Sequence, residues 1–303
     1  MLRMRTFTVA MFLIGSLAGS AQSVSAGRQF SSVGTFVGTT PAPPEVLRFL
    51  GAPAGTKAEL VEWSLSLTSA AQYSLRAAYG LTAPNIPGIA TGRVEINRNG
   101  TWKAGKGTKW SASEDVIDLG GFSFVRVGPA VLHVLAADRS LMTGAGAFAF
   151  SLNRTDAIEP PPDPSLPSML GPGGSYSLSP LSTGTAVYGI FEGRTPCLGV
   201  ARELAREVAP GCPKLKFRLT LLQDSATRQP ATYKLEGTLY RSEREEGTWT
   251  LSDKGIVALQ RADRTTLISL LKVSDDAVMF LDRGGKLMVG NASFSCTLER
   301  KKQ

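Results

Sequence analysis

One stretch of this chain occurs twice, and this repeat limits what the chain can fold into. Residues 141–154 and 287–300 match without a gap at six of fourteen positions. The matched pairs are Leu141/Leu287, Met142/Met288, Gly144/Gly290, Phe148/Phe294, Leu152/Leu298 and Arg154/Arg300. Copies roughly 150 residues apart are far too distant for a solenoid and indicate two copies of one domain. A length of 303 residues also fits two domains.

Each copy alternates apolar and polar residues in short segments, which is typical of strands with one buried face. Trp63–Leu67 and Phe217–Leu221 are matching examples in the two copies. Further strands are expected at Tyr73–Leu75, Val116–Leu119, Phe122–Val127 and Val131–Leu135, and at Tyr233–Leu235, Ile256–Leu259, Thr266–Leu271 and Val278–Leu281. Glycine-containing turns separate them, so we predict about eight antiparallel strands per copy, closed into a small barrel or sandwich.

The predicted fold is therefore all-β, with two tandem small antiparallel barrels and a linker between them. Residues 156–175 contain six prolines and three glycines, which is typical of an extended, semi-rigid linker. The first barrel is then assigned to residues 27–155 and the second to residues 176–303. In the second copy, apolar residues spaced by four predict a short amphipathic helix at Val200–Ala209, and Pro44–Leu50 is its shorter counterpart in the first.

The first 26 residues resemble a secretory signal peptide. Arg3 and Arg5 precede a short apolar run, Val9–Leu17, which is too short to span a bilayer, and small residues follow. Ser20 stands where a lipoprotein has its lipidated cysteine, so we expect a soluble product, periplasmic or secreted, that is neither membrane-spanning nor lipid-anchored. The net charge of +8 is scattered along the chain, and no nucleic-acid-binding motif accompanies it.

The cysteines favour one disulfide. Cys197 and Cys212 align with Ala42 and Ala52, so the first copy lacks both together, as expected for a bonded pair. Export would place the chain where disulfides persist. A metal-binding thiolate pair and a redox pair are the alternatives. Cys296 aligns with Phe150, which predicts a buried, inert thiol.

Several short motifs resemble the N-terminal domain of NlpE-type copper-resistance lipoproteins. They are Gly189–Cys197, Gly247–Trp249, Leu281–Asp282 and Phe294–Arg300, with weaker counterparts in the first copy. The resemblance implies a lipocalin-like barrel in the bacterial envelope with a sensory or ligand-holding role. The family's Cys-x-x-Cys is absent, because Cys197 is followed by Leu198, Gly199 and Val200, so copper handling by such a pair does not carry over.

Within that resemblance, two tryptophans and two arginines form a repeat signature. Trp102 and Trp249 each follow Gly-Thr, and a Gly-x-Trp near a strand start closes the base of lipocalin-like barrels. Arg154 and Arg300 end the two copies. We expect each arginine to lie over its tryptophan in a cation–π contact.

Residues suited to catalysis are sparse. The single histidine, His133, cannot build a His-based triad or a multi-histidine metal site, and its alignment with Met279 suggests a packing or surface position. The remaining candidates have structural interpretations: turn acids at Glu114–Asp115 and Asp275–Asp276, linker glycines in Gly171–Ser175, and core packing for Met142 and Met288. We therefore expect no catalytic, cofactor or metal site, and a protein that is not an enzyme.

Two classes of function remain in first place. A closed barrel can hold a small apolar ligand at its mouth, which would make a binding or stress-sensing module. Alternatively, two barrels on a stiff linker could serve as a structural scaffold for an envelope protein partner. Copper binding or resistance through Cys197 and Cys212 is a third alternative.

Overall fold

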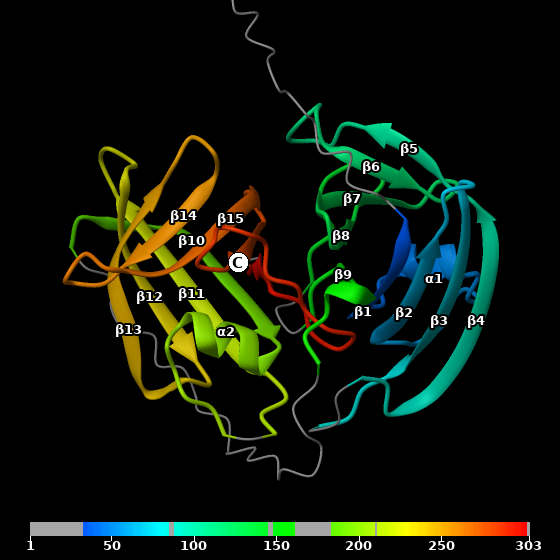
Figure 1. The fold of residues 1–303 in the computed structure, drawn as a ribbon, viewed down its shortest axis with the longest axis horizontal. Helices are drawn as coiled ribbons and strands as arrows, with labels where there is room; N and C mark the ends of the chain where they lie inside the picture. Colours follow the sequence, from blue (N-terminus) through cyan, green and yellow to red (C-terminus); the bar gives the residue numbers. More distant parts are fainter. Residues whose placement is uncertain (1–32, 85–87, 145–147, 161–182, 210, 302–303) are drawn as a thin grey trace, which may run out of the picture. The chain divides into compact units, whose positions relative to one another are not determined.

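The computed structural model describes residues 33–84, 88–144, 148–160, 183–209 and 211–301 (Figure 1). The expected signal peptide and residues 161–175 of the expected linker lie outside the described residues. Among the described helices, none has the length and apolar character needed to cross a bilayer.

The first copy forms a curled antiparallel sheet of nine strands. Their spatial order is β4-β3-β2-β1-β9-β8-β7-β6-β5, so β4 and β5 are the two edges. The strands are β1 (Gly34–Pro41), β2 (Leu60–Leu67), β3 (Gln72–Leu81), β4 (Thr91–Thr101), β5 (Lys103–Lys106), β6 (Asp115–Asp118), β7 (Ser123–Gly128), β8 (Val131–Val134) and β9 (Ser151–Arg154). A short 3-10 helix, η1 (Thr155–Ala157), follows.

The second copy forms a closed antiparallel barrel of eight strands. The strands are β10 (Thr185–Thr195), β11 (Leu215–Asp224), β12 (Pro230–Gly237), β13 (Tyr240–Leu251), β14 (Ile256–Gln260), β15 (Thr266–Ser274), β16 (Ala277–Leu281) and β17 (Thr297–Arg300). The all-β prediction is confirmed, and so is the prediction of two barrel-like copies. Both were expected to be closed; the second is closed, and the first is curled but open.

The first copy is open and the second is closed, and the two differ at the segment that contains the repeated tryptophan. In the second copy β13 runs through Trp249 without a break, and Thr248 pairs both with Thr232 of β12 and with Gln260 of β14. In the first copy the equivalent stretch is interrupted at Trp102, so that β4 pairs with β3 and β5 with β6. The continuous strand β13 closes the second copy into a barrel, whereas the interrupted segment leaves the first copy open between β4 and β5.

A close approach at the start of each copy explains a matched pair of glycines. An added Cβ at Gly38 would lie 2.6 Å from the carbonyl oxygen of Ser151, and one at Gly193 would lie 2.5 Å from that of Thr297. β1 therefore packs against β9, and β10 against β17, at distances that no side chain tolerates. The repeat keeps glycine at both positions for this reason.

Each copy has a short helix after its first strand. α1 (Pro44–Leu50) has the predicted bounds and ends at Gly51, which has a positive φ of 78°. α2 runs from Cys197 to Glu203, so the predicted helix over Val200–Ala209 was wrong at both ends. Pro196 places the helix start earlier, and Ala205, with φ of 52°, takes the chain out of helical geometry.

All ten predicted strands coincide with observed strands: five agree within one residue at each end, and the other five are shorter than the strands that contain them. Met142 and Met288 do not begin strands. They follow isolated bridges that join Leu135 to Leu141 and Leu281 to Leu287. Both methionines are partly buried and pack against the cores of their own copies, as the packing interpretation expected.

Candidate functional site

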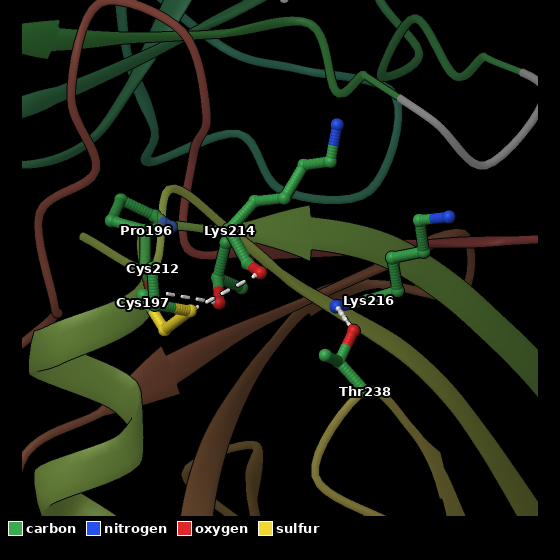
Figure 2. Close-up of a disulfide and its surroundings, with 7 residues drawn as sticks. Pro196, Cys197, Cys212, Lys214, Lys216 and Thr238 are labelled. Atoms are coloured by element: carbon green, nitrogen blue, oxygen red, sulfur yellow. Dashed lines mark hydrogen bonds between the residues drawn. A yellow bond between two sulfur atoms is a disulfide. The ribbon is translucent and has the colours of Figure 1, made fainter. Parts of the chain in front are cut away.

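The disulfide between Cys197 and Cys212 fixes the segment that covers one end of the second barrel (Figure 2). Cys197 is the first residue of α2, and Cys212 lies in the loop that leads into β11. The predicted disulfide is confirmed. The predicted helix began at Val200, so Cys197 was expected to lie in front of it. In the structure Cys197 is the first residue of α2, and the disulfide therefore holds the first turn of the helix.

The thiol count gives a direct check. Unreduced protein in denaturant is expected to react with one equivalent of a thiol reagent, from Cys296, and fully reduced protein with three. Native protein should react with none, because Cys296 is only 4% exposed and burial raises its thiol pKa to about 12. Three reactive thiols without reductant would show that the bridge does not form.

α2 acts as a lid because its apolar face continues the barrel core. Cys197, Val200, Ala201 and Leu204 are all at most 2% exposed and belong to the same cluster as the inward-facing strand residues. The loop after the helix then passes over the barrel end and carries Arg206. Lid, disulfide and barrel core therefore form one packed body, which holds this arginine over the barrel end.

A charged cluster lies under this lid. Glu245 faces the barrel interior, since its cross-strand partner Leu235 is a core residue. Its carboxylate accepts hydrogen bonds from Arg206 Nη2 at 2.9 Å and from Arg261 Nε at 3.2 Å. The Glu245 side chain is 15% exposed, whereas the arginines are 44% and 34% exposed. The carboxylate is thus held inside, and the two guanidinium groups lie between it and solvent.

Two tyrosines beside this cluster have unsatisfied hydroxyls. Tyr233 is fully buried and Tyr240 is 8% exposed, and neither hydroxyl has a hydrogen-bond partner among the described residues. Arg206 lies over the Tyr240 ring at 5.1 Å. Burial, reinforced by the Glu245 carboxylate, raises the pKa of both phenols, so both are neutral donors at physiological pH. Unpaired buried donors are uncommon and mark a place where a partner is missing.

A cavity of about 600 Å³ adjoins the same end of the barrel. Its apolar lining comes from Ile256, Leu267, Ile268 and Leu281, and Arg261 is the member of the charged cluster that also lines it. The Glu203–Arg283 pair and Asp282 complete its rim. This volume lies in the range of ordinary small-molecule sites.

The repeat signature lies at the other end of the second barrel. Trp249 is buried near the end of β13 and donates to the Leu222 carbonyl at 2.6 Å. Arg300 does not lie over Trp249, so that expectation was wrong. Its guanidinium lies over Phe191 at 4.9 Å and Tyr188 at 5.4 Å, and Tyr188 in turn packs on the tryptophan. One aromatic ring separates the predicted partners.

Replacing Arg300 with alanine is expected to destabilise the second barrel by about 1–2 kcal/mol, because the guanidinium also donates to the carbonyls of Asp275 and Tyr188. Thermal unfolding measures the loss. Arg300→Lys is the matched control and should lose less, since it keeps the charge over the rings. A melting temperature unchanged by Arg300→Ala would contradict this role.

In the first copy the signature has a different form. Trp102 is half-buried between β4 and β5 and donates through its ring nitrogen to the Thr68 carbonyl at 3.2 Å. Arg154 pairs with the Asp156 carboxylate at 2.6 Å, two residues further along the chain, rather than lying over Trp102. The expected cation–π contact is therefore replaced by an ion pair.

The buried polar residues of the molecule gather where the two copies meet. Ser151 and Thr297 occupy equivalent positions in the repeat, and their hydroxyls lie 3.0 Å apart. Asn153 and Glu299 are likewise equivalent. Asn153 accepts from the backbone N–H of Gly290, and Glu299 accepts from that of Gly144, which is the repeat equivalent of Gly290. Equivalent groups thus contact each other reciprocally, as in a two-fold symmetric dimer.

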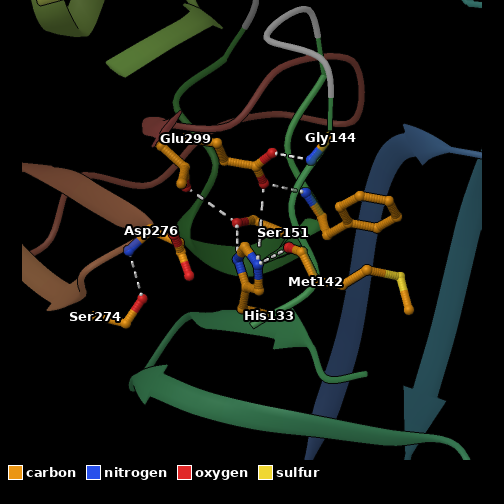
Figure 3. A network of polar contacts seen from close by, with 9 residues as sticks. His133, Met142, Gly144, Ser151, Ser274, Asp276 and Glu299 are labelled. Atoms are coloured by element: carbon orange, nitrogen blue, oxygen red, sulfur yellow. Dashed lines mark hydrogen bonds and ion pairs between the residues drawn. The ribbon is translucent and has the colours of Figure 1, made fainter. Parts of the chain in front are cut away.

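His133 belongs to this contact and is completely buried (Figure 3). Its Nε2 lies 2.8 Å from the Met142 carbonyl oxygen, which can only accept, so Nε2 carries the proton of a neutral ring. Nδ1 therefore accepts from the Ser151 hydroxyl at 2.9 Å, which leaves Ser151 to accept from Thr297. Glu299 Oε1 is 4.0 Å from Nε2. The sequence alignment with Met279 gave no sign of this network.

The other candidates have structural roles. Asp115 pairs with Lys106 and Arg126, and Asp275 pairs with Lys272, while the Asp276 backbone N–H is capped by Ser274. Gly171–Ser175 lies outside the described residues. Within the described part of the chain, no group of three or more His, Cys, Asp and Glu side chains is placed to hold a metal ion.

Comparisons with known proteins give little more. No known protein family matches the chain. No curated protein matches it. Among solved structures, a "putative lipoprotein" from Shewanella oneidensis matches with 15% identity and a TM-score of 0.27, over 41% of this chain and 88% of that one. A TM-score this low leaves the function to be argued from the residues themselves.

Proposed function

We propose that this protein is a non-enzymatic, exported protein of the bacterial envelope, periplasmic or secreted, whose second barrel holds a small ligand at the end covered by α2. The observation that carries the proposal is the pair of unpartnered phenol hydroxyls, Tyr233 and Tyr240, next to the Arg206–Glu245–Arg261 cluster. The disulfide and the NlpE-type resemblance support an exported binding or stress-sensing module.

The ligand interpretation rests on unmet hydrogen bonds. A buried hydroxyl without a partner costs about 1–3 kcal/mol, and two such groups side by side would be expected to accumulate only where something else pairs with them. Arg261, which belongs to the charged cluster, also lines the cavity at this end of the barrel. The first copy has Arg98 at the position of Glu245, with its guanidinium over the Phe49 ring, so the arrangement is specific to the second barrel.

The non-enzymatic part of the proposal follows from access. Ser151 and His133 form a hydrogen-bonded pair that resembles a nucleophile and its base, but they are 2% and 0% exposed. A substrate could reach neither of them without separating the two copies. Copper binding is not part of the proposal, because the sulfurs of Cys197 and Cys212 are bonded to each other.

Native mass spectrometry of protein purified without denaturant tests the binding function. The proposal expects a stoichiometric mass above that of the disulfide-bonded chain, which disappears when the protein is denatured and refolded by dialysis. A bare chain mass from several expression hosts, together with no thermal shift across a small-molecule panel, would overturn it.

A second function, as a scaffold for an envelope protein, is favoured by the edge strand β4. Among the strands of the described residues, β4 pairs only with β3, and Val94 on it is 42% exposed. Exposed edges of this kind can accept an added strand from a partner. A photo-crosslinker at Val94 should then capture one defined protein that a crosslinker at Leu251, an exposed apolar residue of the second barrel, does not capture. Identical products at both positions would remove this candidate.

A further inference from the structure

Three cations lie together on the outer wall of the second barrel, where β10 meets β11. Arg194 and Lys216 are directly opposite each other in the register of the two strands, whereas the adjacent pair, Thr195 and Leu215, is fully buried. Lys214 precedes Lys216 by two residues, and Figure 2 shows both lysine side chains leaving the chain on the same side. Opposite side chains of an antiparallel pair have Cβ atoms about 5 Å apart, so these charges repel each other.

The first copy has no such repulsion at the equivalent positions. There Thr39 lies opposite Glu62 in the register of β1 and β2, and the matched glycines Gly38 and Gly193 give the alignment. The second copy therefore has two like charges where the first has a hydroxyl and a carboxylate. Like charges directly opposite each other destabilise a sheet, so the fold alone does not account for this pair.

Two of the three cations are held against aromatic rings. The Arg194 guanidinium lies 5.5 Å from the centre of the Phe148 ring, and Lys214 Nζ lies 5.5 Å from the centre of the Phe294 ring. These two rings stack on each other at the contact between the copies. A cation over an aromatic face is attracted by the ring, so both charges are held in position beside Lys216.

The neighbouring carboxylate does not neutralise the cluster. Glu192, two residues before Arg194 on β10, accepts from Arg218 Nε at 2.6 Å. Within the described part of the chain, neither Lys214 nor Lys216 forms an ion pair. Burial, followed by repulsion from Arg194 and Lys216, lowers the pKa of the Lys214 ammonium. An anion placed between these side chains would therefore relieve a repulsion that is built into the folded chain.

A phosphate group matches three cations better than a carboxylate does. A phosphate monoester carries a charge of about −1.5 to −2 at neutral pH and has three acceptor oxygens, whereas a carboxylate has one charge and two oxygens. Arginine and lysine both bind phosphate, arginine through its planar fork and lysine as a compact charge.

We infer that Arg194, Lys214 and Lys216 form a binding site for a phosphate group on the outer wall of the second barrel. This site does not depend on the proposed function, because alternation along β10 and β11 places it outside the barrel and the Tyr233–Glu245 cluster lies inside. Two sources share the chemistry, a free phosphate ion and the phosphomonoester head group of a lipid.

Calorimetric titration of the intact protein with inorganic phosphate tests the site, and sodium chloride at matched ionic strength is the control for screening. Cosedimentation with phosphatidylcholine vesicles that contain either phosphatidic acid or phosphatidylglycerol tests the lipid source. Saturable phosphate binding would support a free ion. Cosedimentation with phosphatidic acid but not with phosphatidylglycerol would support a lipid head group. Equal responses to phosphate and chloride, together with equal or no binding to the two lipids, would overturn the inference.

Replacing Lys216 should have opposite effects on stability and on binding. Lys216→Gln removes the repulsion across the strand pair, so it should raise the melting temperature in phosphate-free, low-salt buffer by about 1–2 °C. The same variant should weaken binding of phosphate or phosphatidic acid about tenfold. Lys216→Arg keeps the charge and should retain binding. Lys254→Gln, at an exposed position in the turn between β13 and β14, is the matched control and should change neither quantity. Unchanged affinity in Lys216→Gln would overturn the site.

Discussion

Replacing Glu299 with alanine is expected to lower the free energy of unfolding by about 3 kcal/mol or more. The carboxylate accepts from the backbone N–H groups of Gly144 at 2.5 Å and Phe150 at 3.0 Å, and it is 2% exposed. Alanine would leave both donors unpaired in the opposite copy, with that of Phe150 buried and that of Gly144 partly buried. Urea unfolding of the intact chain at neutral pH measures the loss.

Two controls separate this effect from a loss of charge. Glu95, whose side chain is 72% exposed, should change stability by less than about 0.5 kcal/mol on replacement with alanine. Glu299→Gln keeps one acceptor oxygen and should lose less than Glu299→Ala. A loss below about 1 kcal/mol for Glu299→Ala would mean that the contact between the copies is far looser than these hydrogen bonds indicate.

The contact around Glu299 joins equivalent positions of the two copies. The two copies have similar strands, but the polar residues at this contact differ between them. Phe148 and Phe294, equivalent in the repeat, stack on each other at 5.8 Å. Around them the polar partners are reciprocal but not identical, with Asn153 opposite Gly290 and Glu299 opposite Gly144. A duplicated module that packs against itself keeps its shape-determining residues and can diversify the hydrogen-bonding ones.

The repeat and the period-two pattern predicted ten of the seventeen strands that the structure describes. Leu152 and Leu298 face their own cores, and the alternation places their neighbours Ser151, Asn153, Thr297 and Glu299 on the outer face of each sheet. A sequence pattern defines inside and outside only relative to a residue's own sheet. It cannot show that the other copy covers the outer face. The pattern alone would therefore place these four polar residues in solvent, whereas the structure buries them.

The residues of the candidate site differ in how much of their role the sequence alone reveals. Cys197 and Cys212 were found because both are replaced together in the first copy, which is information about a pair. Tyr233 and Glu245 were not found, because each has the alternation of an ordinary strand residue. Their significance comes from Arg206, which a loop brings to them from 39 residues away in the case of Glu245.

Lowering the pH from about 6.5 to about 4 is expected to cost the native state about 3 kcal/mol through His133 alone. Burial lowers its pKa from the usual 6.5 to about 4, so between these values the unfolded chain takes up a proton that the folded chain excludes. Stability is therefore full above pH 6.5 and falls as the pH drops. Protonation would also place a hydrogen on Nδ1, which now accepts from Ser151.

His133→Gln isolates this effect because the glutamine amide can still donate to the Met142 carbonyl and accept from Ser151, yet it does not titrate. Urea unfolding at several pH values from 4.5 to 7.5 should give a steeper loss of stability for the natural protein than for the variant. The carboxylates titrate mainly below this range and contribute equally to both proteins. Parallel stability curves would mean that His133 is reached by solvent, and hence that the two copies separate readily at their shared face.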